Sequence, residues 1–256
     1  MAKGNDGNLL QHGVELAAVS AITNHSLHLT CTHSMAPRES CPAPSRNRRL
    51  CHWLNSGLDF PSVVAAYRRN EASLDRYPNT AELVASIIGD DNISGDLFEV
   101  SENKVTELLA RWSETDLHVH GNSWRQGLSK VKPPAPETSW LFTMDPMTFL
   151  PDTEGPVDDD AMLRPNDVSL LIKYFQNVGV VGPKWVISIF CFELRSGPVN
   201  YYDLFLSEMR RMSNGLSLGM ASFQVTYGNP HVAAVFSPSE DVIEQIGREW
   251  QVLHNV

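Results

Sequence analysis

The sequence predicts an α/β fold in which helices cover both faces of a mostly parallel sheet. From residue 79 onward, short apolar segments of strand character alternate with helical segments, as βαβ units require. Near the C-terminus, strands expected at 216–227 and 231–237 are separated by only three residues, a connection that permits only antiparallel pairing. With 256 residues, the chain fits one α/β domain that carries an insert.

Composition and charge exclude several classes of protein. Hydrophobic residues make up 42% and charged residues 20% of the chain. No apolar run approaches the roughly 20 residues of a membrane span, so disordered, fibrous and membrane-spanning classes are excluded. The net charge of -10 repels a polyanion unless the basic residues cluster. Four scattered cysteines and a polar N-terminal stretch predict a reduced, cytoplasmic protein.

The first part of the chain predicts a helix, a strand and then an insert. Apolar residues recur at helical spacing over 9–24, and alternation over 27–31 indicates a short strand. Prolines and arginines then interrupt the pattern until a second helix at 60–70. We therefore expect residues 37–78 to form a helical insert. The expected core consists of residues 1–36 and 79–256.

The regular part of the chain begins with a predicted capping box. Asn79 precedes a helical run and is followed three residues later by Glu82, the pattern that satisfies the first backbone N–H groups of a helix. The strands expected after it cover 95–100, 116–120, 139–144 and 184–194. The helices expected after it cover 102–112, 123–129, 167–178, 199–213 and 240–254.

Polar residues follow the ends of four of these strands. In an open parallel sheet, ligands bind beyond the carboxyl ends of the strands, near the point where strand order reverses. The residues at these ends are Thr32-His33-Ser34, Glu99, Gly121-Asn122 and Asp145-Pro146. They are the candidate site.

Two of the carboxylates admit two interpretations each. Glu99 either accepts hydrogen bonds from the ribose hydroxyls of a nucleoside cofactor or stabilises the N-terminus of the helix that follows it. Asp145 ends a buried strand, where a carboxylate is costly unless a ligand or a backbone N–H group compensates it.

Short motifs in a fixed order carry a family resemblance. They are Gly4-Asn5-Asp6-Gly7-Asn8-Leu9-Leu10-Gln11-His12, Thr32-His33, Tyr77-Pro78-Asn79-Thr80, Phe98-Glu99, Asn122 and Asp145-Pro146. Over nearly the whole chain this order resembles the large-subunit ribosomal RNA adenine-N6 methyltransferases of the J type. These are class I S-adenosylmethionine-dependent methyltransferases with a small helical subdomain inserted after the first strand.

The resemblance implies a role for each matching position. Histidines 12 and 33 would face the cofactor S-adenosylmethionine, or its product S-adenosylhomocysteine, and Glu99 would hold its ribose. Thr80 stands where the family has a serine, and Asn122 replaces an aspartate near the adenine. Asp145, followed by Pro146, would be the catalytic residue of an N-methyltransferase. The cofactor-binding set is then His12, His33, Thr80, Glu99 and Asn122.

Two motifs depart from the family pattern. Where the family has a glycine-rich Thr-His-Ala-Gly-Ala-Gly, this chain has Thr32-His33-Ser34-Met35-Ala36-Pro37, whose side chains narrow a cofactor site. The family's Asp-Pro-Pro-Tyr becomes Asp145-Pro146-Met147-Thr148, so the ring that stacks on a flipped base is absent. Phe149 is the nearest ring that could replace it.

These departures leave a second function open. A chain that has lost both motifs could be a non-catalytic, methyltransferase-like binding or scaffolding protein. The net charge and the absence of the family's N-terminal Tyr-Arg-His segment argue against ribosomal RNA as the substrate.

Other clusters of polar residues have simpler interpretations. The cysteines at 31, 41 and 51 are ten residues apart, which is unlike the close ligand pairs of zinc sites, so we predict no metal and expect Cys31 and Cys191 in the core. His118 and His120 lie on one face of a strand, as a ligand pair or, as we expect, a solvated edge.

Two charged segments remain. The acidic residues of 152–160 form either a solvated loop or a lid that would favour a cationic substrate or a protein partner. A basic cluster in the insert is either a solvated face or the place where RNA would bind. It consists of Arg46, Arg48 and Arg49.

Overall fold

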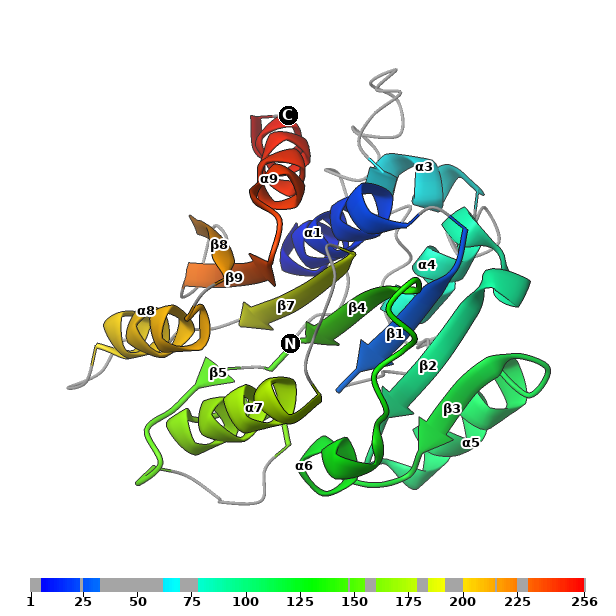
Figure 1. Cartoon of the computed structure of the whole chain (residues 1–256), viewed down its shortest axis with the longest axis horizontal. Coiled ribbons are helices and arrows are strands. Elements are labelled where there is room, and N and C mark those ends of the chain that lie inside the picture. Colours follow the sequence, from blue (N-terminus) through cyan, green and yellow to red (C-terminus); the bar gives the residue numbers. More distant parts are fainter. Residues whose placement is uncertain are drawn as a thin grey trace.

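The structure is a computed structural model, and its description covers residues 6–23, 25–32, 62–69, 78–146, 148–154, 160–178, 184–191, 200–214, 216–224 and 230–255. Within these residues the main sheet has seven strands in the order β3-β2-β1-β4-β7-β9-β8 (Figure 1). The strands are β1 (Leu27–Cys31), β2 (Ile93–Phe98), β3 (Asp116–His120), β4 (Ser139–Met144), β7 (Trp185–Cys191), β8 (Ser217–Gln224) and β9 (Pro230–Ser237).

Strand directions follow the predicted pattern. The pairs β1–β2, β2–β3, β1–β4 and β4–β7 are parallel, whereas β9 runs antiparallel to both β7 and β8. Strand order reverses between β1 and β4, which places the topological switch point in the middle of the sheet. The predicted mostly parallel sheet with a C-terminal antiparallel hairpin is therefore confirmed.

The helices also follow the predicted order. They are α1 (Asp6–Ile22), α3 (Ser62–Arg69), α4 (Thr80–Ile88), α5 (Glu102–Arg111), α6 (Trp124–Gly127), α7 (Pro165–Val178), α8 (Tyr201–Met212) and α9 (Glu240–Asn255). Short 3-10 turns cover Asp90–Asn92 and Leu128–Lys130. The capping box of α4 is present, since Asn79 Oδ1 accepts from the Glu82 N–H group at 2.8 Å and Glu82 Oε2 accepts from the Asn79 N–H group at 3.2 Å.

One small ladder was not predicted. Strands β5 (Thr148–Phe149) and β6 (Met162–Leu163) pair in parallel beside the main sheet. Each strand has two residues, which is too short to produce a detectable period in the sequence.

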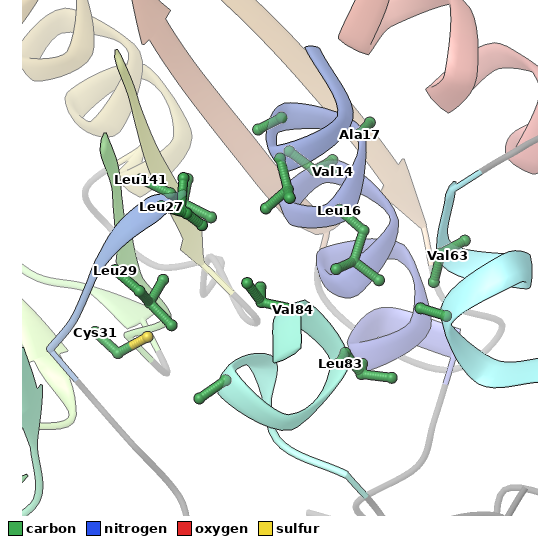
Figure 2. Packing of buried hydrophobic residues seen from close by; sticks show 14 of the residues in the cluster. Val14, Leu16, Ala17, Leu27, Leu29, Cys31, Val63, Leu83, Val84 and Leu141 are labelled. Carbon is green, nitrogen blue, oxygen red and sulfur yellow. The ribbon is translucent and has the colours of Figure 1, made fainter. Parts of the chain in front are cut away.

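Helix α1 is the centre of one core. Residues 11–19 are all buried, because α3, α4 and α9 pack around a helix that already lies on the sheet. Figure 2 shows Val14, Leu16 and Ala17 of α1 with Leu27 and Leu29 of β1 in this cluster. A helix enclosed on all sides must be largely apolar, and among residues 11–19 the polar side chains are those of Gln11, His12 and Glu15.

A second core covers the opposite face of the sheet and is rich in aromatic side chains. Phe142 of β4 contacts Tyr174 and Phe175 of α7, with ring centroids 6.4 and 5.1 Å away. Cys191 of β7 belongs to this core, whereas Cys31 belongs to the first, so both cysteines are buried as predicted.

Helix α3 is the described part of the expected insert, and it packs on α1 and α4. Its first residue is bound by α9, because the Ser62 N–H and hydroxyl groups donate to the buried Glu249 carboxylate at 2.8 and 3.1 Å. The insert boundaries at 37–78 stay a prediction, and Arg46, Arg48 and Arg49 lie outside the described residues. Among the residues described, no helix is long and apolar enough to cross a bilayer.

The close approach of β1 and β2 requires a glycine at position 95. Gly95 has a φ of +140°, and a Cβ atom there would lie 1.8 Å from the Leu29 carbonyl oxygen. Gly95→Ala is therefore expected to destabilise the fold by roughly 3 kcal/mol or more, measured by urea unfolding.

The matched control is Gly247→Ala in α9, where an added Cβ atom meets nothing within 4 Å. There the higher helix propensity of alanine is expected to stabilise by about 0.5–1 kcal/mol. Equal stabilities for the two variants would contradict the packing described at Gly95.

Candidate functional site

The register of the parallel strands brings the predicted residues to one edge. Cys31 pairs with both Leu97 and Thr143, so β1, β2 and β4 end side by side. The pairing continues past the strand ends, since the Thr32 N–H group donates to the Thr143 carbonyl at 3.2 Å and the Glu99 N–H group donates to the His120 carbonyl at 3.1 Å. Glu99, Asn122 and Asp145 therefore follow β2, β3 and β4, which end at the same carboxyl edge on either side of β1. We call this the strand-end site.

Glu99 stabilises its own chain in the way the capping alternative expects. Its buried carboxylate accepts from the Ser101 N–H group at 2.9 Å and from Lys104 Nζ at 3.3 Å. Ser101 is the N-cap residue of α5. A carboxylate has about four acceptor positions, so these two contacts still leave capacity for ligand hydroxyls.

Asp145 is half-buried directly after β4, and Pro146 after it is buried. Phe149 does not replace the missing stacking ring. Its side chain is fully buried in β5, where it meets Phe205 of α8 edge to face at 5.5 Å. The chain turns back into the core there because β5 pairs with β6.

His12 lies inside the protein. Its ring is 4% exposed, and its Nδ1 atom is 3.0 Å from the Tyr67 hydroxyl of α3. Burial lowers the pKa of His12 to about 3, so the ring is neutral at physiological pH. Contact between His12 and a cofactor stays a prediction. His33 lies outside the described residues.

Thr80 leads to a residue that the sequence analysis missed. Its hydroxyl donates to the fully buried carboxylate of Glu15 at 2.7 Å. Gln11 Nε2 and the Thr143 hydroxyl donate to the same carboxylate at 3.0 and 2.5 Å. Burial raises the pKa of Glu15, and the three hydrogen bonds oppose that shift. Glu15 thus ties α1 and α4 to the strand that carries Asp145.

The acidic loop after Asp145 is partly bound to its own chain. Arg125 of α6 donates from Nε and Nη2 to Asp167 at 2.6 and 2.8 Å, and from Nη1 to Asp160 at 2.6 Å. Glu154 accepts from the Tyr201 hydroxyl at 2.8 Å. Asp160 and Glu154 therefore act as internal partners, and whether the loop closes over a ligand stays a prediction. Residues 155–159 lie outside the part described.

His120 pairs with a carboxylate and not with His118. Its Nε2 atom is 2.6 Å from Asp96 Oδ1, and His28 Nε2 is 3.5 Å from Asp96 Oδ2. Burial raises the pKa of Asp96, but the hydrogen bonds and charges of the two histidines outweigh it and lower that pKa to about 2. No motif or spacing in the sequence indicates this cluster, because its members come from three different strands.

Comparison with known proteins shows which of them this chain is similar to. No protein-family model matches the chain, and no curated protein matches it significantly. Protein LPL1258 from Legionella pneumophila, of the family model DUF519, is 16% identical and superposes with a TM-score of 0.66 over 99% of this chain and 93% of its own.

Two more distant structures are methylases. An rRNA methylase from Streptococcus thermophilus is 6% identical over 91% of this chain and 97% of its own, with a TM-score of 0.44. A SAM-dependent methyltransferase from Aquifex aeolicus is 10% identical over 92% of this chain and 94% of its own, with a TM-score of 0.39. These two likenesses are too low for an inference about function.

The strand order and directions define the class of fold. The five strands from β3 to β7 are parallel, and antiparallel β9 lies between β7 and the edge strand β8. This is the Rossmann-like sheet of class I S-adenosylmethionine-dependent methyltransferases. The Legionella protein shares this chain's fold over nearly the full length of both proteins.

The low pKa of Asp96 predicts a specific loss of stability in acid. Asp96 titrates near 2 in the folded chain against an ordinary value of 3.8, so the unfolded state binds more protons between these values. Its contribution of about 2 kcal/mol is present above pH 4 and is lost as the pH falls toward 2.

Urea unfolding of wild type and Asp96→Asn between pH 4.5 and 2 checks this expectation. Throughout this pH range histidines are protonated in the unfolded state. The wild type should lose stability more steeply than the variant, whereas the exposed-site control Asp116→Asn should follow the wild type. Parallel curves for wild type and Asp96→Asn would contradict the assignment.

Proposed function

We propose that this chain binds S-adenosylmethionine at the strand-end site and transfers its methyl group to a nitrogen atom held by Asp145. One observation supports the proposal most strongly: in a class I methyltransferase sheet, Glu99, Asn122 and Asp145 follow three strands that end at the same edge. The cofactor and the acceptor would then meet near the switch point of the sheet.

The residues described at this edge fit the nucleoside half of the cofactor. Glu99 keeps acceptor capacity for the two ribose hydroxyls, and half-buried Asn122 offers both a donor and an acceptor. Val100, which follows Glu99, leaves 57% of its surface exposed and provides apolar area for a base. Residues 33–61, which follow β1, lie outside the described part.

The proposed chemistry depends mainly on positioning. When bound, S-adenosylmethionine supplies an electrophilic methyl group on a sulfonium. The Asp145 carboxylate would accept a hydrogen bond from an N–H group of the acceptor and so direct the nitrogen lone pair toward that methyl group. Buried Pro146 fixes the chain beside it. Alignment of the reacting atoms supplies most of the rate in such a transfer.

The chemical class of the methyl acceptor is a separate question. The family resemblance points to adenine in RNA, but the net charge of -10 and the burial of Phe149 weaken that assignment. We therefore propose an amine nitrogen outside ribosomal RNA as the acceptor. RNA contact through Arg46, Arg48 and Arg49 stays a prediction.

A non-catalytic binding or scaffolding protein is the second candidate. The observation that favours it is Phe149, whose ring packs in the core and is not available to stack on a base. The two candidate functions predict different effects of a substitution at Asp145. Asp145→Ala would abolish methyl transfer under the first, and would leave partner binding unchanged under the second.

Calorimetric titration with S-adenosylhomocysteine tests cofactor binding. The wild type should release heat of binding, and Glu99→Gln should weaken the affinity about tenfold, because a carboxamide accepts less strongly from the ribose hydroxyls. The control Glu102→Gln changes an exposed residue in the first turn of α5 and should bind as the wild type does. Absence of heat with millimolar ligand on the wild type would rule out the proposal.

A further inference from the structure

His28, Asp96 and His120 form a diagonal chain across three strands. They belong to β1, β2 and β3, and their side chains are 15%, 11% and 28% exposed. His120 is the last residue of β3 and stands directly before Gly121-Asn122. Of the three, it is the one that reaches the carboxyl edge and remains open to a ligand there.

The ring of His120 is fixed on one face and at one nitrogen. It stacks on Phe98 with centroids 4.7 Å apart and an interplanar angle of 17°. Phe98 is fully buried against Gly127, where an added Cβ atom would lie 2.3 Å from the Phe98 ring. Because the buried Phe98 ring packs closely on Gly127 and Asp96 binds Nε2 at 2.6 Å, the orientation of the His120 ring is set before any ligand arrives.

The partner of Nε2 also decides what the other nitrogen can do. Asp96 stays ionised down to a pKa of about 2, and an ionised carboxylate only accepts hydrogen bonds. Nε2 must therefore carry the proton that lies between the two side chains. In the neutral ring, Nδ1 is then an acceptor without a proton.

We propose that His120 Nδ1 accepts a hydrogen bond from the exocyclic amino group of the cofactor's adenine, with Asp96 as the positioning residue. This inference rests on the proposed function and adds a specificity determinant to the same site. Adenine presents an N–H donor at its position 6, whereas hypoxanthine presents a carbonyl oxygen there. A fixed acceptor favours the first base and repels the second.

The chemistry of the base can be varied without changing the rest of the ligand. S-adenosylhomocysteine and S-inosylhomocysteine differ at position 6 and at the adjacent N1, which carries a proton in hypoxanthine. Calorimetric titration of both at pH 8, in wild type and in His120→Ala, therefore isolates the contribution of His120. The wild type should bind the adenosyl ligand about tenfold more tightly, which is the size of one hydrogen bond. His120→Ala should reduce this ratio to below about twofold, mainly by weakening the adenosyl ligand.

Two further variants separate the contact from general structure. His118→Ala removes an exposed histidine two residues earlier on the same strand face and should keep the wild-type ratio. Asp96→Asn should lower the ratio, because an amide permits either tautomer of His120. Urea unfolding confirms that each variant is folded before titration.

The outcomes distinguish the two proposals. If the wild type binds neither ligand, cofactor binding itself is wrong and the inference is wrong with it. If the wild type binds S-adenosylhomocysteine but prefers the inosyl ligand or shows no preference, the acceptor assignment is overturned. If a clear preference survives His120→Ala, recognition of the base lies elsewhere and the role of His120 is overturned.

Discussion

The parallel register of β1 with its two neighbours is the constraint on which the candidate site depends. Cys31 pairs with Leu97 on one side and Thr143 on the other, so the three strand ends reach the same edge. Gly95 permits this approach, because any side chain there would collide with the Leu29 carbonyl. A shift of one residue in either pairing would move the strand ends out of step and turn side chains of one core toward the other.

Glu15 connects this edge to the helices beneath it. Burying a carboxylate without a cation is costly, and here side-chain donors on α1, α4 and β4 offset the cost. The network passes through Thr80, which is itself a predicted cofactor-binding residue, and through Thr143, which lies two residues before Asp145. Removal of the carboxylate would leave the donors of buried Gln11 and Thr143 without this acceptor, so the network favours one arrangement of α1, α4 and β4. Asp96 plays a comparable part on the opposite face, where it fixes His120.

Local sequence patterns were sufficient to predict most of the fold. The capping box at Asn79 was predicted from residues three apart and is present with both hydrogen bonds. The three-residue connection near the C-terminus was sufficient to predict antiparallel strands. The ladder of β5 and β6 could not be predicted, since two-residue strands have no period.

The site could be predicted only in part, because its contacts join distant segments. Glu15 meets Thr80 across 65 residues and Thr143 across 128, distances at which spacing in the sequence conveys nothing. The sequence places Glu99 at a strand end, but only the structure shows that its carboxylate accepts from Ser101 and Lys104 and so supports the capping interpretation. The position of Phe149 in the sequence makes it a candidate for the missing stacking ring. In the structure its ring packs against Phe205 in the core.

A crystal structure of the chain with S-adenosylhomocysteine tests the central claim most directly. The account predicts the adenosine at the carboxyl ends of β1, β2 and β3, with its ribose hydroxyls within hydrogen-bond distance of the Glu99 carboxylate. A nucleoside bound at any other edge or face of the sheet, with Glu99 still engaged only by Ser101 and Lys104, would contradict it.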